Sequence, residues 1–244
     1  MVSDIHGNLT ALEAVIADLG RHAPDLVLQG GDLAVVGPRP AEVVDRIREL
    51  GWLGVVGNTD EMLWNPLVRA KQSAAAPKLG SWLKVLFEEL GPWATERLGP
   101  GRIDWLRRLP TQCRAHEMVL VHAMPDDLWR APMPDASDSD LVQSYGSLDA
   151  RQVVYGHIHR PFVRKVGELT VANCGSVGMS WDGDWRPSYV LIQDGAVSVH
   201  RVEHDVERAC KELVGAGFPR PNWLAAVYRT GRFTTPEPQR VVGP

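Results

Sequence analysis

Side chains that can bind metal ions appear at the very start of the sequence, in the segment "SDIHGN". Residues two apart in an extended strand point to the same side, so Asp4 and His6 can converge on one point. A carboxylate and an imidazole form half of a metal site with mixed oxygen and nitrogen ligands. Taken alone, the pair is more typical of a surface acid beside a loop histidine, so the rest of the chain must decide.

Four further segments place Asp, Asn or His directly after an apolar run: Gly31-Asp32, Gly57-Asn58, His122 and Gly156-His157-Ile158-His159. Binding sites in α/β sheets form at the carboxyl ends of strands, and glycine lets the backbone turn sharply beside a ligand. Each segment alone is a weak signal, and a lone His122 is more typical of a hydrogen-bonded core or rim histidine. All five segments in this order predict a ligand set large enough for two metal ions.

The elements that position these residues follow from the apolar spacing. It predicts a helix from Leu9 to Leu19 after an Asn8 cap and before Gly20, and another over 40–50. With the short strands "DLVLQGGD" and "WLGVVGN", they give the β-α-β-α-β order of a parallel sheet. Residues 61–109 predict a helical insertion that covers a sheet edge or a cleft.

The second half of the chain predicts mainly strands. "TQCRAH", "MVLVHA" and "QVVYGHIHRP" are followed by two hairpins, which turn at Gly167-Glu168 and at Asp194-Gly195. A short helix is expected near 138–145 and terminal helices over 205–216 and 221–229. Early βα units and late hairpins together indicate two sheets with helices outside.

Composition limits the class of protein. The 244 residues contain no repeat and no linker, so we expect a single domain over 1–230 and a loose tail over 231–244. The net charge of −4 offers no basic surface for bulk nucleic-acid binding, and no apolar run approaches the length of a membrane helix. Three scattered cysteines without CxxC spacing favour a reducing cytoplasm.

A family resemblance now rests on these segments. "SDIHGN", "GGDL", "GNTDE", "VHA" and "YGHIHRP" resemble the five ordered motifs of calcineurin-like metallophosphoesterases. "VANCGSVGMSWDGDWRPSYVLI" resembles the block that follows in the small bacterial phosphoesterase and phosphodiesterase branch. The resemblance runs from residue 2 to about 200, although residues 61–118 match only in their length and in their expected helical content. The family usually has several apolar residues before the first aspartate, so we expect a strand's length to be missing at the start.

The resemblance implies an α/β fold: a four-layer αββα sandwich of two mixed β-sheets flanked by helices, with the helical insertion around 61–109. It also implies two divalent metal ions, Mn, Fe, Zn or Ni, at the strand ends. The implied ligands are Asp4, His6 and His159 for one ion, Asn58, His122 and His157 for the other, and Asp32 between both. Asp32, Asn58 and His122 are also the implied catalytic residues. Acceptors behind the four histidines should fix their tautomers.

The implied activity is metal-dependent hydrolysis of phosphate esters by in-line attack of a metal-bridging hydroxide. Many relatives have a histidine after Gly-Asn that protonates the leaving group, whereas this chain has Thr59. Loss of a positioned acid costs about 10²–10⁴-fold, mostly with poor leaving groups, so we expect a preference for phosphodiesters. Asp60 is an alternative acid, although an exposed N-capping role is the expected one.

Substrate contacts are expected from Thr59 and from Arg160, which follows the last ligand, ahead of Arg130 and Arg186. Cys174, where relatives often have proline, is expected to be a small buried hydrophobe. The expected partner is a small phosphorylated substrate, and the assembly state is left open between a monomer and a homo-oligomer.

Three other functions stay open. The first is a non-catalytic scaffold of the same fold, against which the seven filled ligand positions argue. The others are a phosphoprotein phosphatase and a nucleotide-polyphosphate hydrolase, in which the insertion frames a base and a tryptophan stacks on it.

Overall fold

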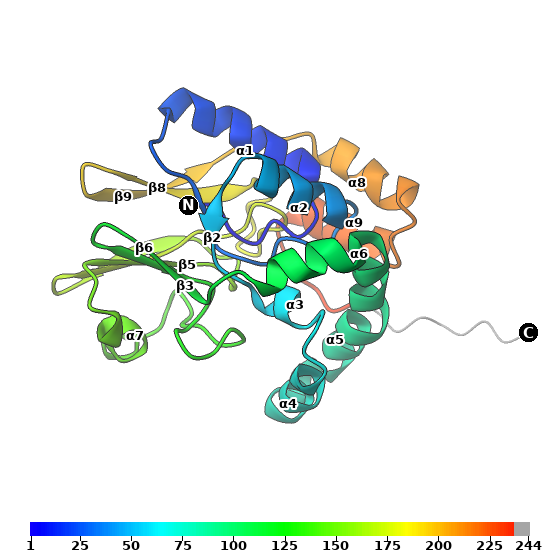
Figure 1. The fold of residues 1–244 in the computed structure, drawn as a ribbon, viewed down its shortest axis with the longest axis horizontal. Coiled ribbons are helices and arrows are strands. Elements are labelled where there is room, and N and C mark those ends of the chain that lie inside the picture. The colour runs from blue at the N-terminus through cyan, green and yellow to red at the C-terminus, as the bar shows by residue number, and fades with distance from the viewer. Residues whose placement is uncertain (237–244) are drawn as a thin grey trace, which may run out of the picture.

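Two β-sheets pack face to face, and helices cover both outer faces (Figure 1). The computed structural model describes residues 1–236 of the chain. The layers run from α1 (Leu9–His22) and α2 (Pro40–Glu49) through the two sheets to α7 (Asp138–Tyr145). The expected α/β fold with a four-layer αββα sandwich is confirmed.

The first sheet has five strands in the order β3-β4-β5-β7-β6. Its strands are β3 (Gln112–Ala115), β4 (Met118–Val121), β5 (Gln152–Tyr155), β6 (Phe162–Val166) and β7 (Leu169–Asn173). The three central strands are parallel, and β3 and β6 pair antiparallel at the two edges. The central strands therefore end on the same side, directly before His122, Gly156 and Cys174.

The second sheet consists of two pairs joined by the first residues of the chain. β1 (Leu28–Gln29) and β2 (Leu53–Gly54) are parallel, whereas β8 (Ser188–Gln193) and β9 (Ala196–Arg201) are antiparallel. Val2 bridges Gln29 in parallel, and the Met1 backbone exchanges hydrogen bonds of 2.7 and 3.0 Å with Val190. The short segment Met1–Val2 thus connects β1 to β8 and brings Asp4 to the end of the sheet.

Alternation along the strands fills two separate cores. Leu120, Val154 and Ala172 of the first sheet face the second sheet, together with buried Cys174. Their neighbours, including Val153, face α7 (Asp138–Tyr145) and η3 (Gly146–Leu148). This period of two is what a sheet buried on both faces requires. The expectation that Cys174 is a buried hydrophobe is confirmed, and burial raises the pKa of its thiol to about 12.

The helices on the opposite face are α1 (Leu9–His22), α2 (Pro40–Glu49), α8 (Val206–Gly215) and α9 (Pro221–Thr230). Asn8 caps α1 as expected, because its side chain accepts from the N–H of Ala11 at 3.1 Å. The helix continues past Gly20, where we expected its end, and stops at Ala23 in a left-handed conformation before Pro24. None of the described helices is long and apolar enough to span a membrane.

The expected insertion is helical. It comprises α3 (Asn58–Glu61), α4 (Leu67–Ala75), η1 (Pro77–Leu79), α5 (Gly80–Val85), η2 (Leu86–Leu90) and α6 (Gly91–Arg107). α6 bends at Gly99, whose φ of 65° is non-helical. In Figure 1, α4 and α5 project away from the two sheets.

The C-terminal segment after α9 packs against the insertion. The ring of Phe233 lies 5.4 Å from that of Trp82 in α5 and 4.8 Å from that of Trp181. Residues 231–236 therefore contact the domain, in contrast to the loose tail expected over 231–244. Residues 237–244 of that expectation lie outside the described part of the chain.

Candidate metal centre

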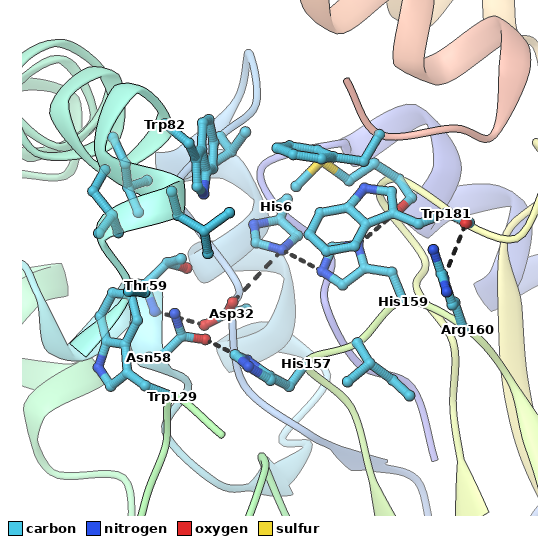
Figure 2. A pocket seen from close by; sticks show the side chains of 18 of the residues that line it. His6, Asp32, Asn58, Thr59, Trp82, Trp129, His157, His159, Arg160 and Trp181 are labelled. Atoms are coloured by element: carbon cyan, nitrogen blue, oxygen red, sulfur yellow. Dashed lines mark hydrogen bonds and ion pairs between the residues drawn. The ribbon is translucent and has the colours of Figure 1, made fainter. Parts of the chain in front are cut away.

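Strand ends from both sheets meet at one place, and all seven predicted ligands lie there. Asp4 and His6 follow the segment joined to β1, and Asp32 follows β1 itself. The remaining four follow β2, β4 and β5: Asn58, His122, His157 and His159. Figure 2 shows His6, Asp32, Asn58, His157 and His159 pointing toward a common centre.

The first group consists of Asp4, His6 and His159. The Nε2 atoms of the two histidines are 3.2 Å apart, and the Asp4 carboxylate lies 3.2 Å from His159 Nε2 and 3.9 Å from His6 Nε2. All three side chains are at most 2% exposed. Their spacing allows one ion to touch all three ligand atoms.

The second group consists of Asn58, His122 and His157. Asn58 Oδ1 lies 2.8 Å from His122 Nε2 and 2.9 Å from His157 Nδ1. Asp32 stands between the groups, with one carboxylate oxygen 3.6 Å from His6 Nε2 and the other 3.6 Å from His122 Nε2. Asp32 is therefore in the position that a carboxylate shared by two metal ions requires.

Backbone carbonyls hold three of the four histidines as expected, whereas the ring of His157 has Asn58 Oδ1 as its partner instead. Nδ1 of His6 donates to Val35 O at 2.6 Å, and Nδ1 of His159 donates to Met179 O at 2.6 Å. His122 is held in the same way by Gly30 O at 2.7 Å. In the neutral form of each ring, Nε2 is then the nitrogen without a proton, and it faces the centre.

This arrangement leaves hydrogen-bond acceptors facing one another. When Nδ1 carries the proton, the lone pairs of His6 and His159 Nε2 face each other and the Asp4 carboxylate across about 3 Å. Buried acceptors with no proton between them repel, and a cation among them removes that cost. The donor set of neutral imidazole, carboxylate and amide oxygen therefore fits divalent transition metals.

Charge in the site follows from burial and from the two aspartates. Burial lowers the pKa of His157 to about 4 and lowers the pKa of His6 as well, so both rings are in the neutral, ligating form. Burial also acts on His122, but the charges of Asp32 and Asp4 outweigh it and raise its pKa. Burial opposes ionisation of Asp4, but the neighbouring His159, His122 and His6 outweigh it and hold the pKa of this carboxyl below its usual range.

The backbone at the site is strained. Five of the seven predicted ligands have a positive φ although none is glycine: Asp4 (55°), His6 (48°), Asp32 (54°), His157 (66°) and His159 (54°). Such conformations cost of order 1–3 kcal/mol each and cluster at functional sites. The sequence does not predict these positive φ angles, because the motifs contain no glycine at these positions.

Asp60 differs from the expectation of an exposed capping residue. It is fully buried, and its carboxylate accepts from the N–H groups of Gly57 at 3.2 Å and Leu33 at 3.1 Å. Burial and the neighbouring Asp32 raise its pKa to about 7. Asp60 does cap α3, but it does so from inside the protein, because the strand end after β1 passes directly over it.

A cavity of about 880 Å³ opens from the candidate metal centre. Its polar end contains His6, Asp32, Asn58, His157 and His159, and its walls carry Trp82, Leu83, Leu86, Trp129 and Trp181. Asp4 and His122 are 0% exposed and lie behind this surface. The insertion thus covers a cleft, which was one of the two expected positions.

The predicted substrate contacts divide into two groups. Thr59 and Arg160 line the cavity, whereas Arg130 and Arg186 do not belong to its lining. The hydroxyl of Thr59 is buried without a hydrogen-bond partner among the described residues, while its backbone N–H donates to Asp32 at 2.8 Å. Arg186 instead pairs with Asp184 at 2.6 Å.

Two lining residues escaped sequence analysis. Arg232 and Phe233 reach the cavity from the C-terminal segment, which we expected to be loose. The only signal was an Arg-Phe pair in a stretch otherwise rich in threonine and proline. Trp82, in the helical insertion, also lines the cavity.

Comparison with known proteins agrees with this geometry. A family model described as the calcineurin-like phosphoesterase superfamily domain matches residues 1–194. The chain belongs to this superfamily, which is metal-dependent.

Individual relatives support the same assignment. An uncharacterized protein of Methanocaldococcus jannaschii, MJ0912, is 29% identical, with 95% of this chain and 97% of that protein covered. Phosphodiesterase YfcE of Escherichia coli K12 is 25% identical, covering 81% and 88%. The crystal structure of a metallophosphoesterase from Sphaerobacter thermophilus superposes with a TM-score of 0.75 at 26% identity, covering 94% of this chain and 98% of that one.

Proposed function

We propose that this protein hydrolyses phosphate esters, with a preference for phosphodiesters, at a site that binds two divalent metal ions. The observation that carries the proposal is the pair of ligand groups on either side of Asp32. One group is Asp4, His6 and His159, and the other is Asn58, His122 and His157. A single ion would contact the ligand atoms of only one of these groups.

The protein's own residues would have separate tasks in this reaction. Two bound divalent ions would supply positive charge for the phosphoryl oxygens and a water of lowered pKa. Asp32 holds both ligand groups together, and its oxygen also fixes the N–H of Thr59. We propose that the hydroxyl of Thr59, which has no partner among the described residues, donates a hydrogen bond to a phosphoryl oxygen of a substrate in the cavity.

The preference for diesters rests on the position after Asn58. Thr59 offers no acid for a leaving group, and the buried Asp60 carboxyl is held by two backbone N–H groups outside the cavity lining. Without a positioned acid, esters whose leaving group needs no proton should react best. The relative YfcE, named a phosphodiesterase, points the same way.

The test is hydrolysis of p-nitrophenyl phosphate against bis-p-nitrophenyl phosphate by metal-stripped protein refilled with Mn²⁺. His157→Ala is the blank, and metal stoichiometry is measured in parallel. We expect metal-dependent turnover of the diester, two ions bound per chain, and loss of turnover in the variant. Preference for the monoester would overturn the proposed preference for diesters. Full metal binding without turnover of either ester would favour the non-catalytic scaffold.

A second candidate is hydrolysis of nucleotide polyphosphates. The cavity favours it, because it has a volume of about 880 Å³ and Trp82 and Trp129 in its lining offer rings on which a base would stack. Release of phosphate from nucleoside triphosphates or dinucleotides, compared with diester turnover under the same conditions, separates the two candidates.

A further inference from the structure

Besides the predicted ligands, the lining of the cavity carries two positive charges that no neighbouring carboxylate neutralises. Among the described residues that line the cavity, the only cations are Arg160 and Arg232. Within the same part of the chain, neither guanidinium has a carboxylate within ion-pair distance. Asp182 is a carboxylate that also lines the cavity, and it is already paired with Arg201.

Both arginines lie against one short stretch of backbone, residues 181–183. Nε of Arg160 donates to Trp181 O at 3.3 Å. The guanidinium of Arg232 passes over Gly183, within 3.7 Å of where a Cβ would be, and Gly183 N–H donates to Gly231 O at 2.8 Å. Backbone contacts thus bring together two charges that are far apart in the sequence.

This pair is separate from the ligands. In Figure 2 the rings of His159 and Trp181 lie between Arg160 and the side chains of Asp32 and Asn58. Trp181 stacks on His159 at 3.9 Å, and its ring also contacts Phe233 at 4.8 Å. A phosphate bound beside Asp32 and Asn58 therefore leaves Arg160 and Arg232 available to a different anionic group of the same molecule.

We infer that Arg160 and Arg232 form an anion subsite, and that the substrate carries a second anionic group besides the phosphate that reacts. This inference rests on the proposed function and narrows its substrate class. Two unpaired guanidinium groups suit a second phosphate, because each offers a fork of N–H donors to its oxygens. The apolar lining of the cavity, which includes Trp82 and Leu83, suits the organic part of such a molecule.

The test compares two ligands that differ by one phosphate, adenosine 5′-monophosphate and adenosine 3′,5′-bisphosphate. Binding to Mn²⁺-loaded protein is measured by calorimetric titration, and the recovered ligand is checked for breakdown. We expect the bisphosphate to bind about tenfold more tightly, and most of this advantage to disappear in Arg160→Gln and in Arg232→Gln. Arg108→Gln, an exposed arginine outside the cavity lining, is the matched control and should keep the full advantage.

Equal binding of the two ligands by the wild-type protein would overturn the inference. An advantage that survives both substitutions would also overturn it, because the extra phosphate would then be bound elsewhere. Because binding is measured without turnover, the outcome is independent of the hydrolysis assay. A preference that depends on both arginines, in a protein inactive on esters, would uphold the subsite and overturn the proposed function. Unchanged thermal unfolding midpoints check that the exposed substitutions leave the fold intact.

Discussion

At the scale of single residues, the site is defined by which atoms have partners and which do not. Nδ1 of His6 and of His159 is bound to a carbonyl, and Nε2 of each ring is left facing another acceptor. The hydroxyl of Thr59 is buried and unpartnered among the described residues. Atoms of this kind are costly in a folded protein unless a ligand satisfies them, so they mark where metal and substrate bind.

Thr59→Val tests the hydroxyl alone, because valine keeps the shape of the side chain. The folded protein loses no hydrogen bond, so the thermal unfolding midpoint should stay the same or rise slightly. For diester hydrolysis we expect kcat/KM to fall about tenfold, the loss of one hydrogen bond to a charged oxygen. Unchanged kcat/KM would show that the hydroxyl does not meet the substrate.

At the scale of elements, the ligands come together because glycines let strand ends approach each other. A Cβ on Gly156, just after β5, would lie 2.2 Å from an Asp4 carboxylate oxygen and 2.1 Å from Ser3 Oγ. The next N–H, of His157, donates to that same carboxylate at 2.9 Å. The first segment of the chain and the end of β5 are thus joined directly at a ligand.

Gly156→Ala should therefore damage the site more than the fold. The added methyl group displaces Asp4, and a displacement near 1 Å costs about a hundredfold in kcat. Metal content should fall with activity, measured by elemental analysis and diester hydrolysis. Gly20→Ala is the matched control: it lies in α1, where a Cβ meets nothing within 4 Å, and should leave both quantities unchanged. Normal activity of the Gly156 variant would contradict this account of the strand ends.

At the scale of the whole molecule, the connections between distant segments hold the layers together. The ring of His204, between β9 and α8, packs 5.3 Å from that of Trp185, and neither ring nitrogen has a partner among the described residues. Burial lowers the pKa of His204 to about 4. The unfolded chain then binds a proton near pH 6.5 that the folded chain takes up only near pH 4.

The free energy of unfolding should consequently decrease as the pH falls from about 6.5 toward 4, because the unfolded state binds more protons in that window. The contribution of His204 is fully present above pH 6.5. In His204→Phe, which keeps a ring against Trp185, the slope of the unfolding free energy against pH should be smaller. The difference should correspond to the binding of up to about one proton. Urea unfolding at pH 7, 6 and 5 measures both slopes, and identical slopes would show that His204 is protonated equally in both states.

The sequence by itself determined the order of elements and the ligand types. Apolar periodicity and turn residues are local signals, so α7 and both hairpins appear where they were expected. The five motifs indicated the family by their resemblance. Their side chains meet in the structure because they follow strands that end at one edge of a sheet. The family resemblance implied Asp32 between two ligand groups, and its two carboxylate oxygens lie 3.6 Å from a histidine of each group.

Only the tertiary structure decided which atoms face each other. Asp60 is buried because another strand end passes over it. Phe233 lies at the cavity because its ring packs against Trp82 of the insertion. Arg160 and Arg232 come close to each other through residues 181–183. Trp181 O accepts from Arg160, and Gly183 N–H donates to Gly231 O, next to Arg232. These features come from long-range packing, which leaves no periodic signal in the sequence, so they could be found only once the chain was folded.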